Sequence, residues 1–182
     1  MKKKELREKY KQIRKDIENK EKLSEQITNK VLSSPEYINA DVICSYISFG
    51  EEVGTIQIIK DALKKGKTVG VPITDKTHMD FYKITSIEEI KHKNSFGIIE
   101  PEKNKEDLII PKSIDLIIAP GICFDLEDNR LGFGKGYYDK YLSNKELTAF
   151  KIGVCFKEQI LVNELIDIDV HDIKMDKVIT DD

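Results

Sequence analysis

Three glycines at alternate positions, Gly132, Gly134 and Gly136, stand in one short segment together with Arg130 and Lys135. An apolar run typical of a strand precedes the segment, and a helical pattern follows it. A strand, a glycine-rich turn and a helix in that order point backbone N–H groups at an anion, and phosphate is the obvious one. The spacing matches neither the dinucleotide-binding fingerprint nor the P-loop. A plain surface loop is the alternative, but the two cations favour a phosphate site.

Arginine is rare in this sequence, because only three of its 30 basic residues are arginine: Arg7, Arg14 and Arg130. Lysine is the default positive charge, and it does not replace the guanidinium where a phosphate or carboxylate is bound through two parallel hydrogen bonds. We therefore interpret the arginines as candidates for ligand recognition, with chance placement as the alternative. If they share one ligand, the N-terminal helix must pack beside the glycine segment.

Carboxylates near the glycine segment suit the Mg²⁺ ion that usually accompanies a polyphosphate, because Mg²⁺ takes one or two carboxylates and keeps several waters. Asp139 closely follows the last glycine. Asp172 is the candidate for a second ligand, with Asp176 as its nearest rival. A surface role is the ordinary reading of any aspartate in so acidic a chain, and only the adjacent glycines favour Asp139 as a ligand.

Two more carboxylates, Glu51 and Glu52, follow an expected strand at its carboxyl end, where open α/β sheets collect ligands. Ile47 and Phe49 flank them. A carboxylate in this place is suited to accept two parallel hydrogen bonds from a planar amidine-like group, such as an aminopterin or guanine edge. Ordinary loop acids are the alternative interpretation.

The cysteines and histidines show no spacing typical of a metal site or of nucleophilic catalysis. Cys44, Cys123 and Cys155 lie far apart in apolar contexts, which predicts buried free thiols. We interpret His78 and His92 as structural or exposed residues.

Hydrophobic periodicity predicts an amphipathic helix over residues 3–17 and a second helix that begins after Ser24 and ends before Pro35. A third helix is expected from Thr55, its N-cap, to Gly66, and short helices are expected later in the chain. The short helices cover residues 86–91 and 137–142, and the strands cover residues 42–47, 68–73, 79–84, 114–119, 151–156 and 178–180.

The strand at 114–119 is apolar throughout, which suits a central strand covered on both faces, whereas the one at 79–84 has the pattern of an edge or antiparallel strand. Strands that alternate with helices at this pitch predict an α/β fold with a mainly parallel sheet. At 182 residues, a single domain is expected.

The composition excludes several classes of function. With 30 basic and 33 acidic side chains, the net charge is −3, and the chain lacks the broad positive field that most nucleic-acid binding requires. The longest uncharged stretch, 116–124, is far too short to span a bilayer, and no apolar run follows the basic N-terminus. We therefore expect a cytoplasmic protein that binds neither nucleic acid nor membranes.

Several motifs in this order resemble the 5-formyltetrahydrofolate cyclo-ligase family over nearly the whole chain. They are KKELR at 3–7, YISFGEEVGT at 46–55, FGIIEP at 96–101, PGICFDLEDNRLGFGKGYYDKYL at 120–142 and HDIKMDKVIT at 171–180. The RLGFGKGYYD run is highly specific, and the other motifs are individually weak.

The resemblance implies a three-layer αβα domain and an ATP- and Mg²⁺-dependent enzyme that converts 5-formyltetrahydrofolate to 5,10-methenyltetrahydrofolate, with release of ADP and phosphate. Arg14 is family-like, but its role is not given by the resemblance. The implied ATP contacts are Lys3, Arg7, Arg130, Leu131, Gly132, Phe133, Gly134, Lys135, Gly136, Tyr137 and Tyr138. The implied folate contacts are Ile47, Glu52, Phe133, Gly134, Lys135, Gly136 and Tyr137, and the implied magnesium ligands are Asp139 and Asp172.

The expected chemistry needs no protein nucleophile, because ATP activates the formyl oxygen through an N5-iminium phosphate. Among the ATP contacts we expect Lys135, together with Arg130, to carry the charge nearest the transferring phosphoryl group. Two other classes stay open: a sugar-phosphate or acyl-CoA enzyme on a related scaffold, and a nucleotide- or folate-binding module without turnover. The sequence leaves open whether the protein is a monomer or a homodimer.

Overall fold

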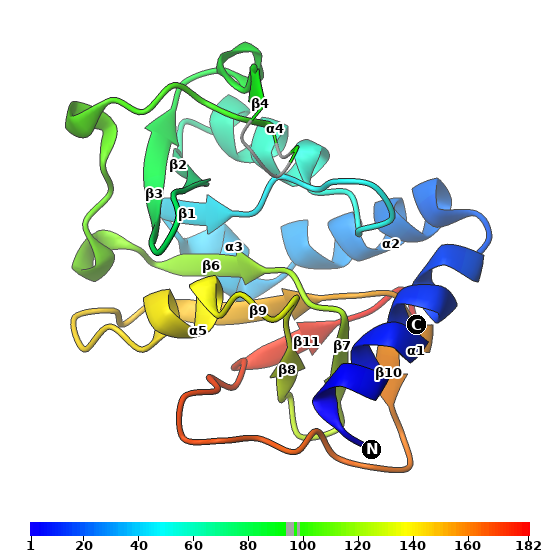
Figure 1. Ribbon diagram of the computed structural model, residues 1–182. Helices are drawn as coiled ribbons and strands as arrows, with labels where there is room; N and C mark the ends of the chain where they lie inside the picture. Colours follow the sequence, from blue (N-terminus) through cyan, green and yellow to red (C-terminus); the bar gives the residue numbers. More distant parts are fainter. Residues whose placement is uncertain (94–96, 98) are drawn as a thin grey trace.

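A six-stranded sheet forms the centre of the molecule in the computed structural model, which describes residues 1–93, 97 and 99–182 (Figure 1). The strand order is β11-β9-β6-β1-β2-β3, and only β3 runs antiparallel to its neighbour. These strands are β1 (Val42–Ser45), β2 (Thr68–Thr74), β3 (Met79–Ile84), β6 (Leu116–Ala119), β9 (Phe150–Val154) and β11 (Lys177–Ile179).

Five α-helices and two small sheets surround this sheet in the described part of the chain. The helices are α1 (Lys3–Asp16), α2 (Lys20–Leu32), α3 (Pro35–Asn39), α4 (Ile56–Lys64) and α5 (Tyr137–Leu142). The small sheets consist of β7 (Cys123–Asp125), β8 (Arg130–Leu131) and β10 (Ile160–Leu161), and of β4 (His92–Lys93) and β5 (Ile99–Glu100).

Strand β6 shows why the sheet is buried on both faces. Its side chains alternate, so that Leu116 and Ile118 pack in one apolar cluster while Ile117 and Ala119 pack in another. All four are fully buried. The expected central strand and the mainly parallel α/β architecture are therefore confirmed.

Helices α2, α3 and α4 cover one face of the large sheet through the first cluster. On the other face, α5 is joined to β3 by an edge-to-face contact between Tyr141 and Phe81, whose ring centroids are 5.0 Å apart. Helix α1 packs elsewhere, with Leu6 and Tyr10 in a third cluster against the β10-β7-β8 sheet. This third cluster fixes the N-terminal helix beside the hairpin that leads into the glycine segment.

The second helix begins earlier than the sequence predicts. It starts at Lys20, after Asn19 in a left-handed conformation, whereas the hydroxyl of Ser24, expected as the N-cap, accepts a hydrogen bond from the N–H of Gly54. Pro35 does not simply end this helix, because it is the first residue of α3, where Ser34 Oγ accepts a hydrogen bond from the N–H of Tyr37. Proline is well suited to that first helical position.

The remaining sequence predictions differ at the ends of elements. Strand β1 ends at Ser45, two residues early, and the hydroxyl of the next residue, Tyr46, donates to the carbonyl of Val53. The three cysteines are free and buried, as predicted. In the FGIIEP motif, Phe96 and Ile98 lie outside the described residues, as does the side chain of His92. No helix among the described residues is long and apolar enough to cross a bilayer.

The strand order of the large sheet reverses at one point, and two connections leave the sheet there. From β1 the chain moves to β2 on one side, and it later returns to β6 on the other side, so the order reverses between β1 and β6. In open α/β sheets, the crevice at such a reversal lies at the carboxyl ends of the strands. The loop after β1 carries Glu52, and the chain after β6 leads into the glycine segment.

Candidate active site

Arg130 anchors the start of the glycine segment from inside the protein. Its side chain is only 3% exposed, and one terminal nitrogen donates to the carbonyl of Pro120 at 3.2 Å. The other terminal nitrogen pairs with Oδ1 of Asp139 at 2.9 Å. A Cβ atom at Gly132 would come within 2.8 Å of the guanidinium, so any side chain at this position would have to displace Arg130. Strand β8 and helix α5 are thus tied together across the segment.

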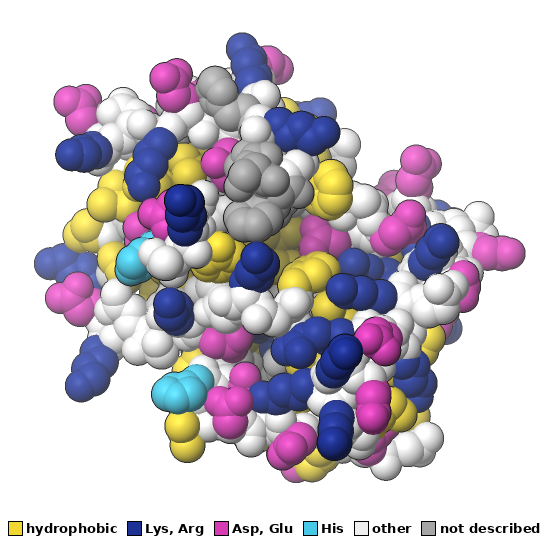
Figure 2. All heavy atoms as spheres, viewed as in Figure 1, with side chains coloured by type: hydrophobic (Ala, Val, Ile, Leu, Met, Phe, Trp, Pro, Cys, Tyr) yellow, Lys and Arg dark blue, Asp and Glu magenta, His cyan; other side chains and the backbone are white. Residues whose placement is uncertain are grey.

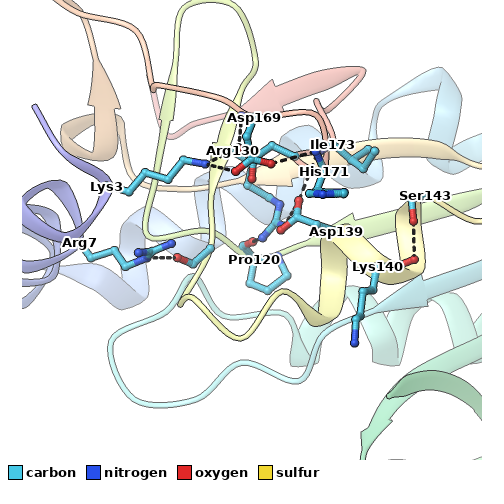
Figure 3. A network of polar contacts seen from close by, with 12 residues as sticks. Lys3, Arg7, Pro120, Arg130, Asp139, Lys140, Ser143, Asp169, His171 and Ile173 are labelled. Carbon is cyan, nitrogen blue, oxygen red and sulfur yellow. Dashed lines mark hydrogen bonds and ion pairs between the residues drawn. The ribbon is translucent and has the colours of Figure 1, made fainter. Parts of the chain in front are cut away.

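Helix α1 lies beside this segment and contributes the other two arginines, of which Arg7 is labelled in Figure 3. Arg7 donates from Nε to the carbonyl of Gly132 at 2.9 Å. One turn from the end of the helix, the Arg14 guanidinium lies over the ring of Phe133, with 5.5 Å between its Cζ and the ring centroid. All three arginines of the chain therefore contact residues 130–139.

Lys3, at the start of α1, contacts the segment that precedes β11. Its ammonium group pairs with Asp169 at 3.0 Å and with Asp172 at 2.5 Å. Burial opposes the charged form, but these two carboxylates raise the pKa of Lys3. The next residue along, Ile173, donates its N–H to Oδ1 of Asp139 at 3.2 Å. The expected metal ligands Asp139 and Asp172 therefore lie in one polar network (Figure 3).

The two carboxylates fit magnesium by their chemistry. Carboxylate oxygens are hard ligands, and Mg²⁺ next to a polyphosphate needs only one or two of them. Both contacts of Asp139 use Oδ1, so Oδ2 is available for an ion. The structure groups no three His, Cys, Asp or Glu residues for a metal within the described chain, so substrate phosphates and waters would have to complete the coordination.

Glu52 lies in the loop after β1 and is partly buried. Burial raises the pKa of Glu52, although a hydrogen bond from the N–H of Phe49 at 2.9 Å and the charge of Arg14 act in the opposite direction. Tyr138 lies close to Glu52. Burial raises the pKa of this tyrosine, and the negative charge of Glu52 raises it further. The Tyr138 hydroxyl has no hydrogen-bond partner among the described residues.

Tyr138 connects the two halves of the site, because Cζ of Arg130 lies 5.6 Å from its ring centroid. Ile47, the other expected folate contact on this loop, is partly buried and packs against the first apolar cluster. Guanidinium groups, backbone amides and a partly buried carboxylate therefore surround one region at the carboxyl ends of β1 and β6. Such a set can bind an anion on one side and a planar hydrogen-bond donor on the other.

A sequence profile of the 5-formyltetrahydrofolate cyclo-ligase family matches residues 1–181. The chain belongs to this family. A mouse protein named 5-formyltetrahydrofolate cyclo-ligase is 37% identical in an alignment of 189 positions, gaps included, which covers 97% of this chain and 92% of that protein. A probable 5-formyltetrahydrofolate cyclo-ligase of Schizosaccharomyces pombe is also 37% identical, over 85% of this chain and 81% of its own length.

A solved structure of the same family resembles this cyclo-ligase family member over its whole length. It is the NMR structure of 5,10-methenyltetrahydrofolate synthetase from Aquifex aeolicus, with a TM-score of 0.84 and 32% identity. The match covers 100% of this chain and 90% of the other.

Several residues with polar or nucleophilic side chains form no hydrogen bond or ion pair with the three arginines in the described part of this cyclo-ligase family member. Asp176, the rival metal ligand, pairs with Lys151 at 2.7 Å through the oxygen that also accepts the N–H of that lysine. His78 and His171 are exposed. Burial raises the pKa of the Cys44 and Cys155 thiols and of the Cys123 thiol, the last to about 12. None of these cysteines has the lowered pKa of a nucleophile.

The loop residues between Gly132 and Tyr138 have different environments in this cyclo-ligase family member. Leu131 is buried in the third cluster, whereas Phe133, Gly134, Lys135 and Gly136 are exposed. Tyr137 is partly buried, and its hydroxyl donates to the carbonyl of Asp75 in the β2–β3 turn at 2.9 Å. The helix that follows, α5, has only six residues, so local N–H groups rather than a long helix dipole face the loop.

Sequence reasoning missed two aspartates that shape the site of this cyclo-ligase family member. Asp169 shares Lys3 with Asp172, whose Oδ2 accepts the N–H of Asp169. Asp125 is 2% exposed and its carboxylate accepts the N–H groups of Glu127, Asn129 and Ile166. In the D-L-E-D-N run, Asp125 stands two residues before Glu127 and four before Asn129, and this spacing is the signal of an Asx turn that predicts the two local hydrogen bonds.

Proposed function

We propose that this chain is a 5-formyltetrahydrofolate cyclo-ligase, which consumes ATP to convert 5-formyltetrahydrofolate to 5,10-methenyltetrahydrofolate. The observation that carries the proposal is the convergence of Arg7, Arg14 and Arg130 on the glycine segment next to Glu52. This arrangement combines an anion site with a carboxylate acceptor, which are the two features that ATP and a pterin require. Family membership supports the same assignment.

The reaction needs activation of a poor electrophile. The formyl oxygen attacks the γ-phosphorus of ATP, the bond from phosphorus to the bridging oxygen breaks, and ADP leaves. N10 then attacks the formyl carbon of the N5-iminium phosphate, the carbon–oxygen bond breaks, and phosphate leaves while N10 loses its proton. Such transfer depends on positioning and charge neutralisation rather than on a protein nucleophile.

The chain's own residues bind the two substrates on opposite sides of the reacting atoms. On the ATP side we assign the phosphates to the backbone N–H groups of the glycine segment and to Arg7, Arg130 and Lys135, with Lys3 nearby. On the folate side, Glu52 accepts hydrogen bonds from the amino-pyrimidine edge of the pterin, and Ile47 and Phe133 provide apolar contact. Binding both substrates next to each other brings the formyl oxygen close to the γ-phosphate, which is the main contribution the protein has to make.

Magnesium belongs to this proposal as the partner of the ATP phosphates. Asp139 and Asp172 are the residues that would hold it, because their carboxylates share one network with Lys3 and Arg130. When bound, the ion neutralises phosphate charge.

The other function classes fit the site less well. A sugar-phosphate or acyl-CoA enzyme does not require the Arg130–Asp139 pair beside a partly buried carboxylate such as Glu52. A non-catalytic module binds both ligands without turnover, so only a kinetic measurement separates it from the enzyme. We propose that residues 1–182 act as one domain in the cytoplasm, which the three free cysteines support, since disulfides are rare there. The oligomeric state stays open.

The test is a spectroscopic assay on the purified full chain with 5-formyltetrahydrofolate, ATP and Mg²⁺. We expect near-ultraviolet absorbance of the methenyl product to rise only when ATP and the metal are both present. Controls omit one component at a time. A folded protein that binds ATP and folate without any rise is a binding module, and the proposal of catalysis then fails.

A further inference from the structure

Arg14 is buried, yet it lacks the partners that a buried guanidinium needs. Arg14 is 9% exposed, and its side chain forms no hydrogen bond or ion pair with any residue that the structure describes. Arg7 and Arg130, in contrast, both donate to carbonyl oxygens, and Arg130 also pairs with Asp139. A guanidinium has five N–H donors and no acceptor, so a side chain this enclosed gains from a ligand that supplies the missing acceptors.

The nitrogens of Arg14 are open to a ligand even though the stem is enclosed. Within the described chain, four residues have a side-chain nitrogen or oxygen that is fully enclosed and lacks a hydrogen-bond partner: Glu36, Arg130, Tyr138 and Tyr141. Arg14 is not one of them. Its N–H groups therefore keep accessible surface. The stem and the flat face of the guanidinium pack against the protein, with Phe133 on one side. This is the geometry of a binding group rather than of a solvated surface charge.

Arg14 also lies between the two substrate sides. Phe133, which Arg14 contacts, belongs to the glycine segment. Glu52 and Tyr46 follow β1, where the folate contacts are expected. Burial raises the pKa of both, and the nearby positive charge of Arg14 partly offsets this rise. Arg14 and Glu52 nevertheless form no ion pair within the described residues. An ion pair would have used the N–H donors of Arg14, so these donors can still bind a substrate group.

The reaction brings one particular group to this position. Because the γ-phosphorus and the formyl oxygen must come within bonding distance, the transferring phosphoryl group lies where the ATP side and the folate side meet. We propose that Arg14 binds the oxygens of this phosphoryl group during its transfer and is a catalytic residue of the cyclo-ligase reaction. The inference rests on the proposed function and gives a catalytic role to a residue that the sequence marks only as a candidate for ligand recognition and to which the family resemblance gives no role.

The side of the molecule that carries α1 is suited to this task. Figure 2 shows Lys and Arg side chains gathered over the N-terminal helix, next to the region where the glycine segment lies in Figure 1. A planar guanidinium binds phosphoryl oxygens through two parallel hydrogen bonds, whereas an ammonium group provides only a point charge. The many lysines around it therefore do not duplicate the function of Arg14.

The test compares Arg14→Gln with the parent and with Lys11→Gln, which removes one positive charge from an exposed position of the same helix. We expect Arg14→Gln to lower kcat and kcat/KM for ATP about 100- to 1,000-fold, as loss of one preorganised donor does elsewhere. Because the interaction belongs to the transition state, the KM values for ATP and folate should change less than threefold. Lys11→Gln should behave like the parent.

Two further measurements separate catalysis from a role in folding. Arg14→Ala should regain part of its kcat with millimolar guanidinium, but not with methylammonium, and Arg14→Lys should stay far below the parent. If the glutamine variant does not fold, Arg14→Met, which keeps an apolar stem next to Phe133, is measured in its place. A folded variant with kcat within threefold of the parent, or one whose loss is confined to KM, overturns the assignment of Arg14. An inactive parent overturns the proposed function instead.

Discussion

At the scale of single residues, Asp139 has two partners that fix its place. Its carboxylate is the counter-charge of the buried Arg130 and the acceptor for the N–H of Ile173. It joins helix α5 to the segment that precedes β11. Loss of its charge therefore affects both the stability of the fold and any ion bound with the phosphates.

Asp139→Asn should keep the hydrogen bond from Ile173 while it removes the charge. We expect the Mg²⁺ concentration for half-maximal activity to rise at least about tenfold, and the free energy of unfolding to fall by about 2 kcal/mol because Arg130 becomes an unpaired buried charge. Metal titration of the activity and urea unfolding measure the two effects. Asp176→Asn is the control, since Asp176 pairs with Lys151 instead. An equal shift in both variants would falsify the magnesium assignment.

Glu52, the proposed folate-binding carboxylate, reduces the stability of the folded state near neutral pH. Burial raises its pKa above the ordinary value of 4.5. A carboxyl group with a higher pKa in the folded state binds its proton more tightly there. Its contribution to stability is therefore largest below about pH 4.5 and is lost as the pH rises through the folded-state pKa.

Glu52→Gln should accordingly gain stability relative to the parent as the pH rises from 4 to 7, because no charge has to be buried. It should also bind folate about 10- to 100-fold more weakly, which corresponds to the loss of a charged hydrogen bond. Urea unfolding at several pH values and calorimetric titration with folate provide the readings. Glu51→Gln, at an exposed residue paired with Lys20, should leave folate affinity unchanged. Equal folate binding by the Glu52 variant and the parent would contradict the assignment.

At the scale of elements, the turn between β8 and α5 requires glycine for different reasons at different positions. Gly134 and Gly136 have φ angles of +101° and +71°, which favour glycine, whereas at Gly132 the guanidinium of Arg130 occupies the space that a Cβ would need. The turn is therefore shaped around an arginine as much as by its own backbone.

Gly132→Ala should displace Arg130 and lower kcat/KM about tenfold or more. Gly66→Ala is the matched control, because Gly66 ends α4 at a φ of +73° with nothing within 4 Å of an added Cβ. It should cost about 1 kcal/mol of stability from backbone strain and leave the kcat/KM of the folded enzyme unchanged. Steady-state kinetics and thermal unfolding of both variants test this. If Gly132→Ala has full activity, the position of Arg130 is not critical.

At the scale of the whole molecule, the site is assembled from distant parts of the chain. Lys3 and Asp172 are 169 residues apart, and Arg7 contacts Gly132 over 125 residues. A ligand that bridges these parts binds the folded state alone, so it stabilises the entire domain rather than one loop.

ATP with Mg²⁺ at one hundred times its Kd should increase the free energy of unfolding by about 2.7 kcal/mol and raise the Tm by about 5–10 °C. Far-ultraviolet and near-ultraviolet circular dichroism should report the same transition, because one domain unfolds at once. Arg7→Met should lose most of this ATP-dependent shift, whereas Lys11→Gln should keep it. Two separate transitions, of which only one responds to ATP, would contradict a single domain.

Local sequence patterns were sufficient for elements whose stability is mainly local or periodic. The apolar run of β6, the 3–4 spacing of Leu6 and Tyr10 in α1 and the edge pattern of β3 predicted their elements correctly. Local rules failed where a side chain had a distant partner. Ser24 was predicted to cap a helix, but its hydroxyl binds the N–H of Gly54, 30 residues away.

The sequence by itself determined the fold class, the family and the list of candidate residues, because residue types, spacing and periodicity are local properties. The tertiary structure alone decided which of them meet. It joined Asp139 to Arg130, placed Lys3 between Asp169 and Asp172, and left Arg14 buried without a hydrogen bond or ion pair to any described residue. Those relations arise from chain crossings at the reversal between β1 and β6 and from the docking of α1 on the small sheet, which no local pattern encodes.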